Sequence, residues 1–123
     1  MAKILILDEC PTTRKLLAEE LAGEGNVVVS TGKAELILEE VVSFNPDVAI
    51  FDSFGGGKYR RALWEEVKNQ NPDLPIIIFS EPDVNGHLHL TRNEGFIMKR
   101  FDLNEIKECI SEILTQPDLA VSM

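Results

Sequence analysis

Side chains suited to metal and anion chemistry follow short apolar segments of the chain. Asp8 and Glu9 follow the first such segment, and Asp52 follows the third. Ser80 and Lys99 come directly after the fourth and the fifth. Carboxylate oxygens suit Mg²⁺, and a lysine with a hydroxyl can hold an anion. Brought together, these groups describe phosphoryl transfer, in which a metal-bound aspartate can act as the nucleophile.

The apolar segments that precede these residues are typical of strands buried on both faces. They are rich in Ile, Val and Phe and do not alternate apolar with polar residues, which is the pattern of a parallel sheet. The expected strands are residues 4–7, 27–29, 48–51, 76–79 and 96–98.

Longer segments with helical periodicity lie between the expected strands. The last of them begins at Asp102, a good N-cap, with Glu105 three residues later as in a capping box. Residues 83–92 carry a weak pattern and predict a short or loosely held helix. Residues 116–123 predict a short unstructured tail. The apolar stripes are Leu17, Ala18 and Leu21; Ala34, Ile37, Leu38 and Val41; Leu63, Trp64 and Val67; and Leu103, Ile106, Ile110, Ile113 and Leu114.

This alternation predicts an α/β fold, a doubly wound five-stranded parallel sheet with helices on both faces. The order 2-1-3-4-5 is the flavodoxin-like choice, with its ligand site at the carboxyl ends of the first and third strands. Asp8, Glu9 and Asp52 would then share one crevice, where like charges repel. A hard divalent cation, Mg²⁺, would resolve that repulsion.

Length and composition limit the other possibilities. The chain has 123 residues, the size of one domain, and a formal net charge of -9, which disfavours direct binding of nucleic acid or anionic membrane. Its two cysteines exclude a disulfide scaffold and a four-cysteine zinc site. We interpret Cys10 as structural and Cys109 as a core residue. No apolar run is long enough for a membrane span or a signal peptide, so we expect a cytoplasmic protein.

Four motifs together carry a resemblance to a known family. They are KILILDE, PDVAIFD, IIIFS and GFIMKRF, in this order and each at the end of an expected strand. With them, the chain resembles the receiver domain of bacterial two-component response regulators, the chemotaxis-regulator-like family. The resemblance runs from Lys3 to Leu114, so we expect a receiver domain over residues 1–115.

The resemblance implies a phosphoacceptor and a magnesium site. Asp52 matches the family's phosphoacceptor. Asp8 and Glu9 match the acidic pair that holds Mg²⁺ together with Asp52, and Phe54 would add its backbone carbonyl. Such a domain is not an enzyme acting on other substrates, since it catalyses only its own phosphorylation and dephosphorylation.

The resemblance also implies a switch and partners. Ser80 and Lys99 match the hydroxyl and the lysine that contact the phosphoryl group, and Phe96 matches the aromatic switch residue. The donor would be a sensor histidine kinase or a phosphotransfer protein. The signal would pass in trans to a downstream protein partner through the face of the fourth helix, fifth strand and fifth helix, from a monomer or weak homodimer.

Several residues depart from the family pattern and leave alternatives open. Glycines fill residues 55–57, which we interpret as a flexible strand-to-helix loop. Glu81 stands where a small residue is usual, and Arg100 stands where proline is usual. These departures suggest, as an alternative, a phosphorylation-independent pseudo-receiver that acts as a protein-binding module. A flavin carrier or small hydrolase on the same architecture is a third possibility.

Overall fold

The computed structural model describes residues 1–52, 54–55, 58–59, 61–80, 94–98 and 103–115 of the chain. Within these ranges the side chains of residues 52, 54–55, 58–59, 61, 79–80, 94–98, 103 and 105 are not described. The strands are β1 (Lys3–Leu7), β2 (Val27–Thr31), β3 (Val48–Asp52), β4 (Phe54–Gly55), β5 (Lys58–Tyr59), β6 (Ile76–Ser80) and β7 (Glu94–Met98). The helices are α1 (Pro11–Gly23), the 3₁₀ turn η1 (Ala34–Leu36), α2 (Ile37–Phe44), α3 (Arg61–Gln70) and α4 (Leu103–Thr115).

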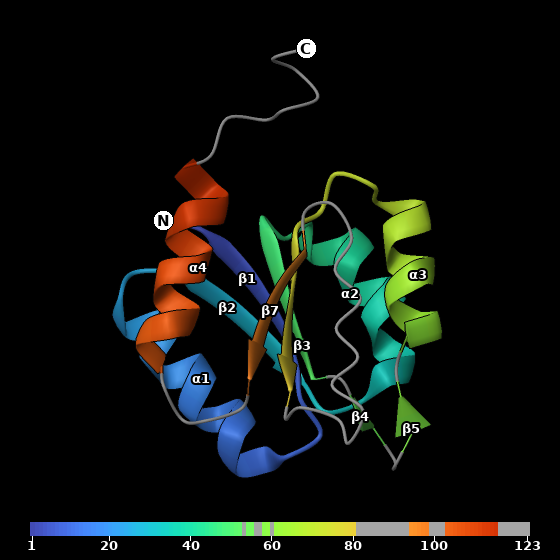
Figure 1. Cartoon of the computed structure of the whole chain (residues 1–123), viewed down its shortest axis with the longest axis horizontal. Helices are drawn as coiled ribbons and strands as arrows, with labels where there is room; N and C mark the ends of the chain where they lie inside the picture. The colour runs from blue at the N-terminus through green and yellow to red at the C-terminus, as the bar shows by residue number, and fades with distance from the viewer. Residues whose placement is uncertain (53, 56–57, 60, 81–93, 99–102, 116–123) are drawn as a thin grey trace.

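The larger strands pair in parallel. β1 lies between β2 and β3, and β6 pairs with the other edge of β3. Figure 1 shows the strands side by side, with α1 and α4 on one side of the sheet and α2 and α3 on the other. The α/β flavodoxin-like class predicted from the sequence is therefore confirmed.

Two hydrophobic layers hold the sheet between the helices. Alternate strand residues such as Ile6 and Ile50 pack with α1 and α4, through Leu17 and Ile106 among others. The residues between them in the strands pack on the opposite face with α2 and α3. This second layer includes Leu5, Leu7, Ala49, Phe51, Ile76 and Ile78 from the strands and Ile37, Val41, Trp64 and Val67 from the helices. Both faces of β1, β3 and β6 are buried, which explains why these strands are continuously apolar.

Helix boundaries follow local chain chemistry. Pro11 occupies the first turn of α1, where its missing N–H removes no hydrogen bond, and Cys10 before it is extended, as residues before proline prefer to be. Asn45 ends α2 in the left-handed region, with φ of 51°. Asparagine tolerates this conformation at a helix end, and Pro46 after it prevents the helix from continuing.

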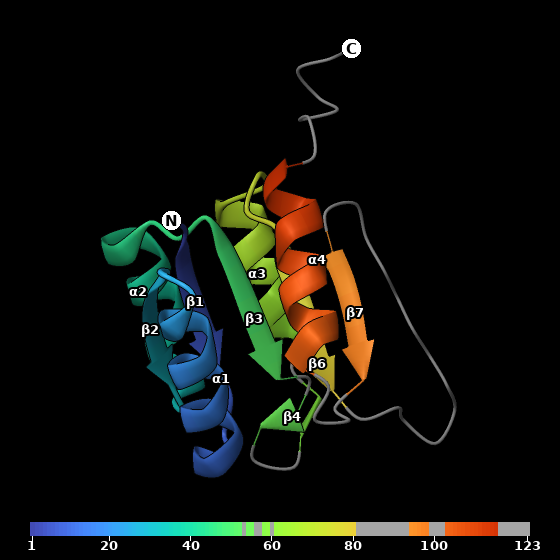
Figure 2. The same ribbon diagram turned by 90° about the vertical axis from the view of Figure 1, so that its left-hand side faces the viewer.

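The segment after β3 differs from the sequence prediction. Phe54 pairs with Tyr59 and Gly55 with Lys58, forming a two-stranded antiparallel ribbon, β4–β5. Figure 2 places β4 at the end of the sheet toward which the arrowheads of β3 and β7 point. The pairing of Gly55 with Lys58 differs from the loop expected there. Gly56 and Gly57 of the expected loop lie outside the described residues.

Other sequence predictions fall outside the described residues. They are the weak helix at residues 83–92, the Asp102 cap and the tail at residues 116–123. In the part of the chain that the structure describes, no helix is long and apolar enough to cross a membrane.

An ion-pair cluster joins the helices that cover one face. Lys107 of α4 lies 3.3 Å from Glu20 Oε2 of α1 and 3.1 Å from Oε1 of Glu24, the C-cap of that helix. Hydrogen bonds from Lys107 to Glu24 and then to Glu20 raise the pKa of the lysine. The cluster therefore ties α4 to α1 across 87 residues of sequence.

The buried layers predict unequal effects for two aliphatic truncations. Ile50 is 1% exposed in the central strand, whereas Val42 on α2 is 72% exposed. Ile50→Ala should lower the free energy of unfolding by about 2–5 kcal/mol through lost burial and a cavity. Val42→Ala should change it by about 0.5 kcal/mol or less. Urea denaturation followed by circular dichroism measures both, and equal effects would contradict the layered core.

The Lys107 cluster predicts a salt- and pH-dependent contribution to stability. Lys107→Gln should lower the urea midpoint at neutral pH, and the difference should shrink in about 1 M salt, where charges are screened within about 3 Å. Because the folded-state pKa is raised, this contribution is complete below the unfolded value of about 10.4 and is lost as pH rises through the folded value.

Lys15→Gln is the matched control for that measurement. Lys15 makes a 3.9 Å pair with Glu19, and both side chains are well exposed. Such pairs contribute little. If Lys15→Gln lowered the midpoint as much as Lys107→Gln, a specific role for the cluster between α1 and α4 would be refuted.

Candidate acidic site at the carboxyl ends of the strands

The register between β1 and β3 sets two acidic residues side by side. Leu7 pairs with Phe51, so the next residues, Asp8 and Asp52, occupy neighbouring positions on strands about 4.8 Å apart. This is the carboxyl edge of the parallel sheet, where doubly wound folds bind their ligands. The backbone thus places two of the predicted acidic residues as the sequence indicated.

Backbone pairing also places the predicted hydroxyl at this edge. Asp52 pairs with Phe79, so Ser80 lies one residue further along β6. Ser80 in turn pairs with Met98, after which Lys99 follows in the sequence, and Phe96 pairs with Ile78. Lys99 lies outside the described residues. The side chains of Asp52, Ser80 and Phe96, which the sequence predicts for phosphoryl contact and switching, are not described either. The side-chain roles predicted for Asp52, Ser80, Lys99, Phe96 and Phe54 therefore stay predictions.

Asp8 is held from several directions. Only 1% of the residue is exposed, and its N–H donates to the Thr31 carbonyl oxygen at 3.1 Å, which extends the pairing of β1 with β2 by one residue. Its Oδ1 accepts a hydrogen bond from the Cys10 N–H at 2.9 Å, closing an Asx turn at the start of α1. These contacts give the carboxylate a defined position.

Glu9 differs from its neighbour because it is exposed. The acidic pair therefore combines a buried carboxylate with one that faces solvent. Among the residues whose side chains are described, no three acidic, histidine or cysteine residues gather as metal ligands. The predicted third carboxylate, on Asp52, lies outside that set, so the magnesium trio remains a prediction.

Sequence reasoning did not assign a role to two residues beside Asp8. The Arg14 guanidinium donates from Nη1 to the Asp8 carbonyl oxygen at 2.8 Å. Gly32, which follows β2, lies against the same guanidinium. No sequence motif predicted this contact, because Arg14 and Asp8 are six residues apart and Gly32 comes from another segment of the chain.

No family model matches the sequence. The transcriptional regulator NtrC of Escherichia coli K12, named as DNA-binding, is 28% identical over 105 residues, which cover 83% of this chain. NtrC of Salmonella typhimurium is 27% identical over the same length.

Solved structures match over nearly the whole chain. The response regulator TrrA of Thermotoga maritima, in complex with Mg(2+)-BeF, superposes with a TM-score of 0.79 at 28% identity, covering 92% of this chain and 99% of that one. The chain shares the fold of response-regulator receiver domains and is similar to them in sequence. The receiver domain of NtrX from Brucella abortus shares the fold, with a TM-score of 0.77 at 22% identity, covering 93% of this chain and 99% of that one.

The chain matches only part of the length of its curated relatives. It spans 22% of the length of NtrC from Escherichia coli K12. The DNA binding in that protein's name is a property of NtrC.

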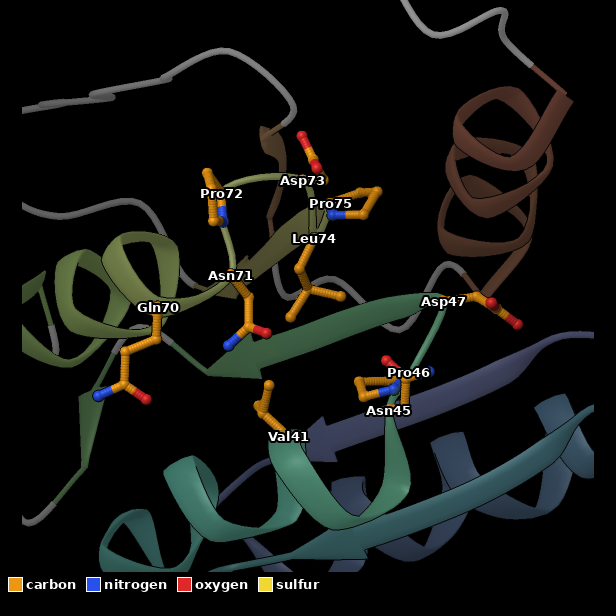
Figure 3. Close-up of a pocket in the computed structure, with 10 residues that line it drawn as sticks. All are labelled: Val41, Asn45, Pro46, Asp47, Gln70, Asn71, Pro72, Asp73, Leu74 and Pro75. Atoms are coloured by element: carbon orange, nitrogen blue, oxygen red, sulfur yellow. The ribbon is translucent and has the colours of Figure 1, made fainter.

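A pocket lies at the opposite end of the sheet, where the parallel strands begin. It has a volume of about 470 Å³ and is formed where α2 leads into β3 and α3 leads into β6. Figure 3 shows Asn71 and Leu74 directed toward Val41 within it. Because this is the amino edge of the strands, the pocket is separate from the acidic site.

The two thiols of the receiver have different surroundings. Cys10 is exposed, and a hydrogen bond from the Thr13 hydroxyl, 3.5 Å from Sγ, is the largest cause that lowers its pKa. Cys109 is half-buried against the α1–α4 layer, and burial raises its pKa. Packing of Cys109 at the core agrees with the sequence prediction, whereas Cys10 stands at the surface as the N-cap of α1.

These surroundings predict selective alkylation. Iodoacetamide at neutral pH should modify Cys10 before Cys109, because reaction requires an accessible thiolate. Peptide mass spectrometry over a time course measures both sites. Cys10→Ser should remove the fast phase and Cys109→Ser should leave it, and preferential labelling of Cys109 would contradict the described geometry.

Proposed function

We propose that the chain contains a receiver domain, over residues 1–115, that accepts a phosphoryl group on Asp52. The observation that supports this most directly is the register that sets Asp8 beside Asp52 at the carboxyl edge. The proposal includes the five-stranded order 2-1-3-4-5, for which the pairing of β7 with β6 is the supporting contact. It also keeps the cytoplasmic location and the 116–123 tail predicted from the sequence.

Magnesium is the cofactor in this proposal. Buried Asp8, exposed Glu9, Asp52 and the Phe54 carbonyl would supply oxygen ligands, a donor set that fits Mg²⁺. TrrA, at 28% identity, was solved with Mg(2+)-BeF, which supports a magnesium site here. Bound magnesium would offset the negative charge that carboxylates and phosphoryl oxygens bring together.

The proposed reaction transfers a phosphoryl group from a phosphohistidine. An Asp52 carboxylate oxygen forms the new P–O bond, the P–N bond of the donor breaks, and the imidazole nitrogen takes up a proton. Lys99 and Ser80 would hold the phosphoryl oxygens. TrrA has also been solved in complex with the histidine kinase ThkA, at a TM-score of 0.78 to this chain, with 28% identity over 94% of this chain and all of TrrA, which supports a kinase as donor.

The output in this proposal is a change of surface. Phosphorylation would draw Ser80 toward the anion, move Phe96, and reshape the face of the fourth helix, fifth strand and fifth helix of the family. In this chain that face includes β7 and α4. A protein partner would read it in trans, with no direct nucleic-acid contact and with the receiver as monomer or weak homodimer. The receiver catalyses only its own phosphorylation and dephosphorylation.

The alternative is a pseudo-receiver whose partner face works without phosphate. The departures at residues 55–57, Glu81 and Arg100 motivate it. It differs from the leading proposal in one measurable respect, which is the absence of phosphoryl uptake on Asp52.

Acetyl phosphate with Mg²⁺ should add one phosphoryl group to the chain. Asp52→Asn should abolish the addition because an amide is a poor nucleophile, and chelation of Mg²⁺ should slow it strongly. Intact-mass spectrometry measures the gain.

Asp47→Asn is the matched control, since Asp47 is exposed at the amino edge of the sheet, where its Oδ2 accepts the Lys3 N–H at 2.8 Å. This variant should be labelled as the wild type is. Folded wild-type protein that gains no mass with Mg²⁺ and acetyl phosphate would overturn the proposal in favour of the pseudo-receiver.

A further inference from the structure

Arg14 connects α1 to the backbone of Asp8. Its side chain is half-buried, and its Nη1 donates to the Asp8 carbonyl oxygen at 2.8 Å. The N–H of Asp8 donates to the Thr31 carbonyl oxygen of β2. Both backbone polar groups of Asp8 are therefore engaged, one by β2 and one by α1.

We propose that Arg14 is a positioning residue for magnesium, acting through the backbone of Asp8; this inference rests on the proposed function. With both backbone groups and Oδ1 engaged, the Asp8 carboxylate is oriented before a cation arrives. Ligand orientation by surrounding hydrogen bonds is worth about 10–100-fold in metal affinity where it has been measured. Arg14 has no part in the phosphoryl step itself.

Gly32 supplies the space that the guanidinium occupies. A Cβ built on Gly32 would collide with Nη1 of Arg14 and lie 3.2 Å from its Cζ. The colliding atoms are the far end of a flexible side chain, so an alanine would displace the guanidinium rather than the backbone. Gly32→Ala thus removes the contact with Asp8 while leaving the charge of Arg14 in the protein.

A positioning role and a charge effect of Arg14 predict opposite changes in magnesium affinity when the side chain is removed. A guanidinium near a cation site repels the cation, so removing the charge alone would tighten Mg²⁺ binding. Removing a positioning hydrogen bond would loosen it. The sign of the change in Arg14→Ala therefore separates the two roles.

The experiment titrates Mg²⁺ into the full chain and follows the Cys10 amide by ¹H–¹⁵N NMR. This amide reports on the site directly because it donates to Asp8 Oδ1. Arg14→Ala and Gly32→Ala should each weaken Mg²⁺ binding about tenfold. The double variant should be no weaker than Arg14→Ala, since residues that act through one contact are not additive.

Lys15→Ala is the matched control, because it removes the same charge from the next residue of α1, where only an exposed pair with Glu19 is lost. Its Mg²⁺ affinity should stay within about twofold of the wild type. Thermal denaturation establishes that each variant is folded. With acetyl phosphate, Arg14→Ala should need more Mg²⁺ for half-maximal labelling but reach a near-normal rate at saturation.

The outcomes separate this inference from the function on which it rests. A wild type that binds Mg²⁺ and is phosphorylated, with Arg14→Ala binding as well or better, would overturn the positioning role alone. Additive losses in Arg14→Ala and Gly32→Ala would also overturn it. A folded wild type that neither binds Mg²⁺ nor takes up phosphoryl would overturn the proposed function and the inference together.

Discussion

The parallel register between β1 and β3 is the constraint on which the acidic site depends. Side chains alternate along a strand, so a slip of one residue would move Ile6 from one helix layer to the other and turn Asp8 with it. Both layers are apolar and closely packed, with Ile6 facing α1 and α4 and Leu7 facing α2 and α3. Core packing on two faces therefore determines where the first carboxylate lies.

The difference between Asp8 and Glu9 also arises from the sheet. Both residues follow an apolar run, and sequence alone treats them as an equivalent pair. In the structure Asp8 still donates to Thr31 and so continues the pairing of β1 with β2, whereas Glu9 has left the sheet and is exposed. One backbone hydrogen bond thus separates a pre-oriented buried carboxylate from one that is exposed to solvent.

The sequence predicted those features that follow from periodicity and chain order. Continuous apolar runs indicated strands covered on both faces, and their alternation with helices indicated which strand ends meet. The β4–β5 ribbon was missed because two-residue strands have no periodicity, although Gly56-Gly57 between them is typical of tight hairpins. Arg14 was missed because its partner is a carbonyl oxygen, which every residue has, and because the contact needs Gly32 from another segment.

The described hydrogen bonds of Asp8 join it to Thr31 of β2, to Cys10 at the N-cap of α1 and to Arg14 of α1. The departures from the family pattern fall elsewhere, at residues 55–57, Glu81 and Arg100. Burying a carboxylate is costly unless its surroundings compensate for it. A module that needed only a constitutive binding face would gain nothing from that cost, whereas a phosphoacceptor site requires it. The burial of Asp8 therefore supports the proposed acceptor chemistry over the pseudo-receiver alternative.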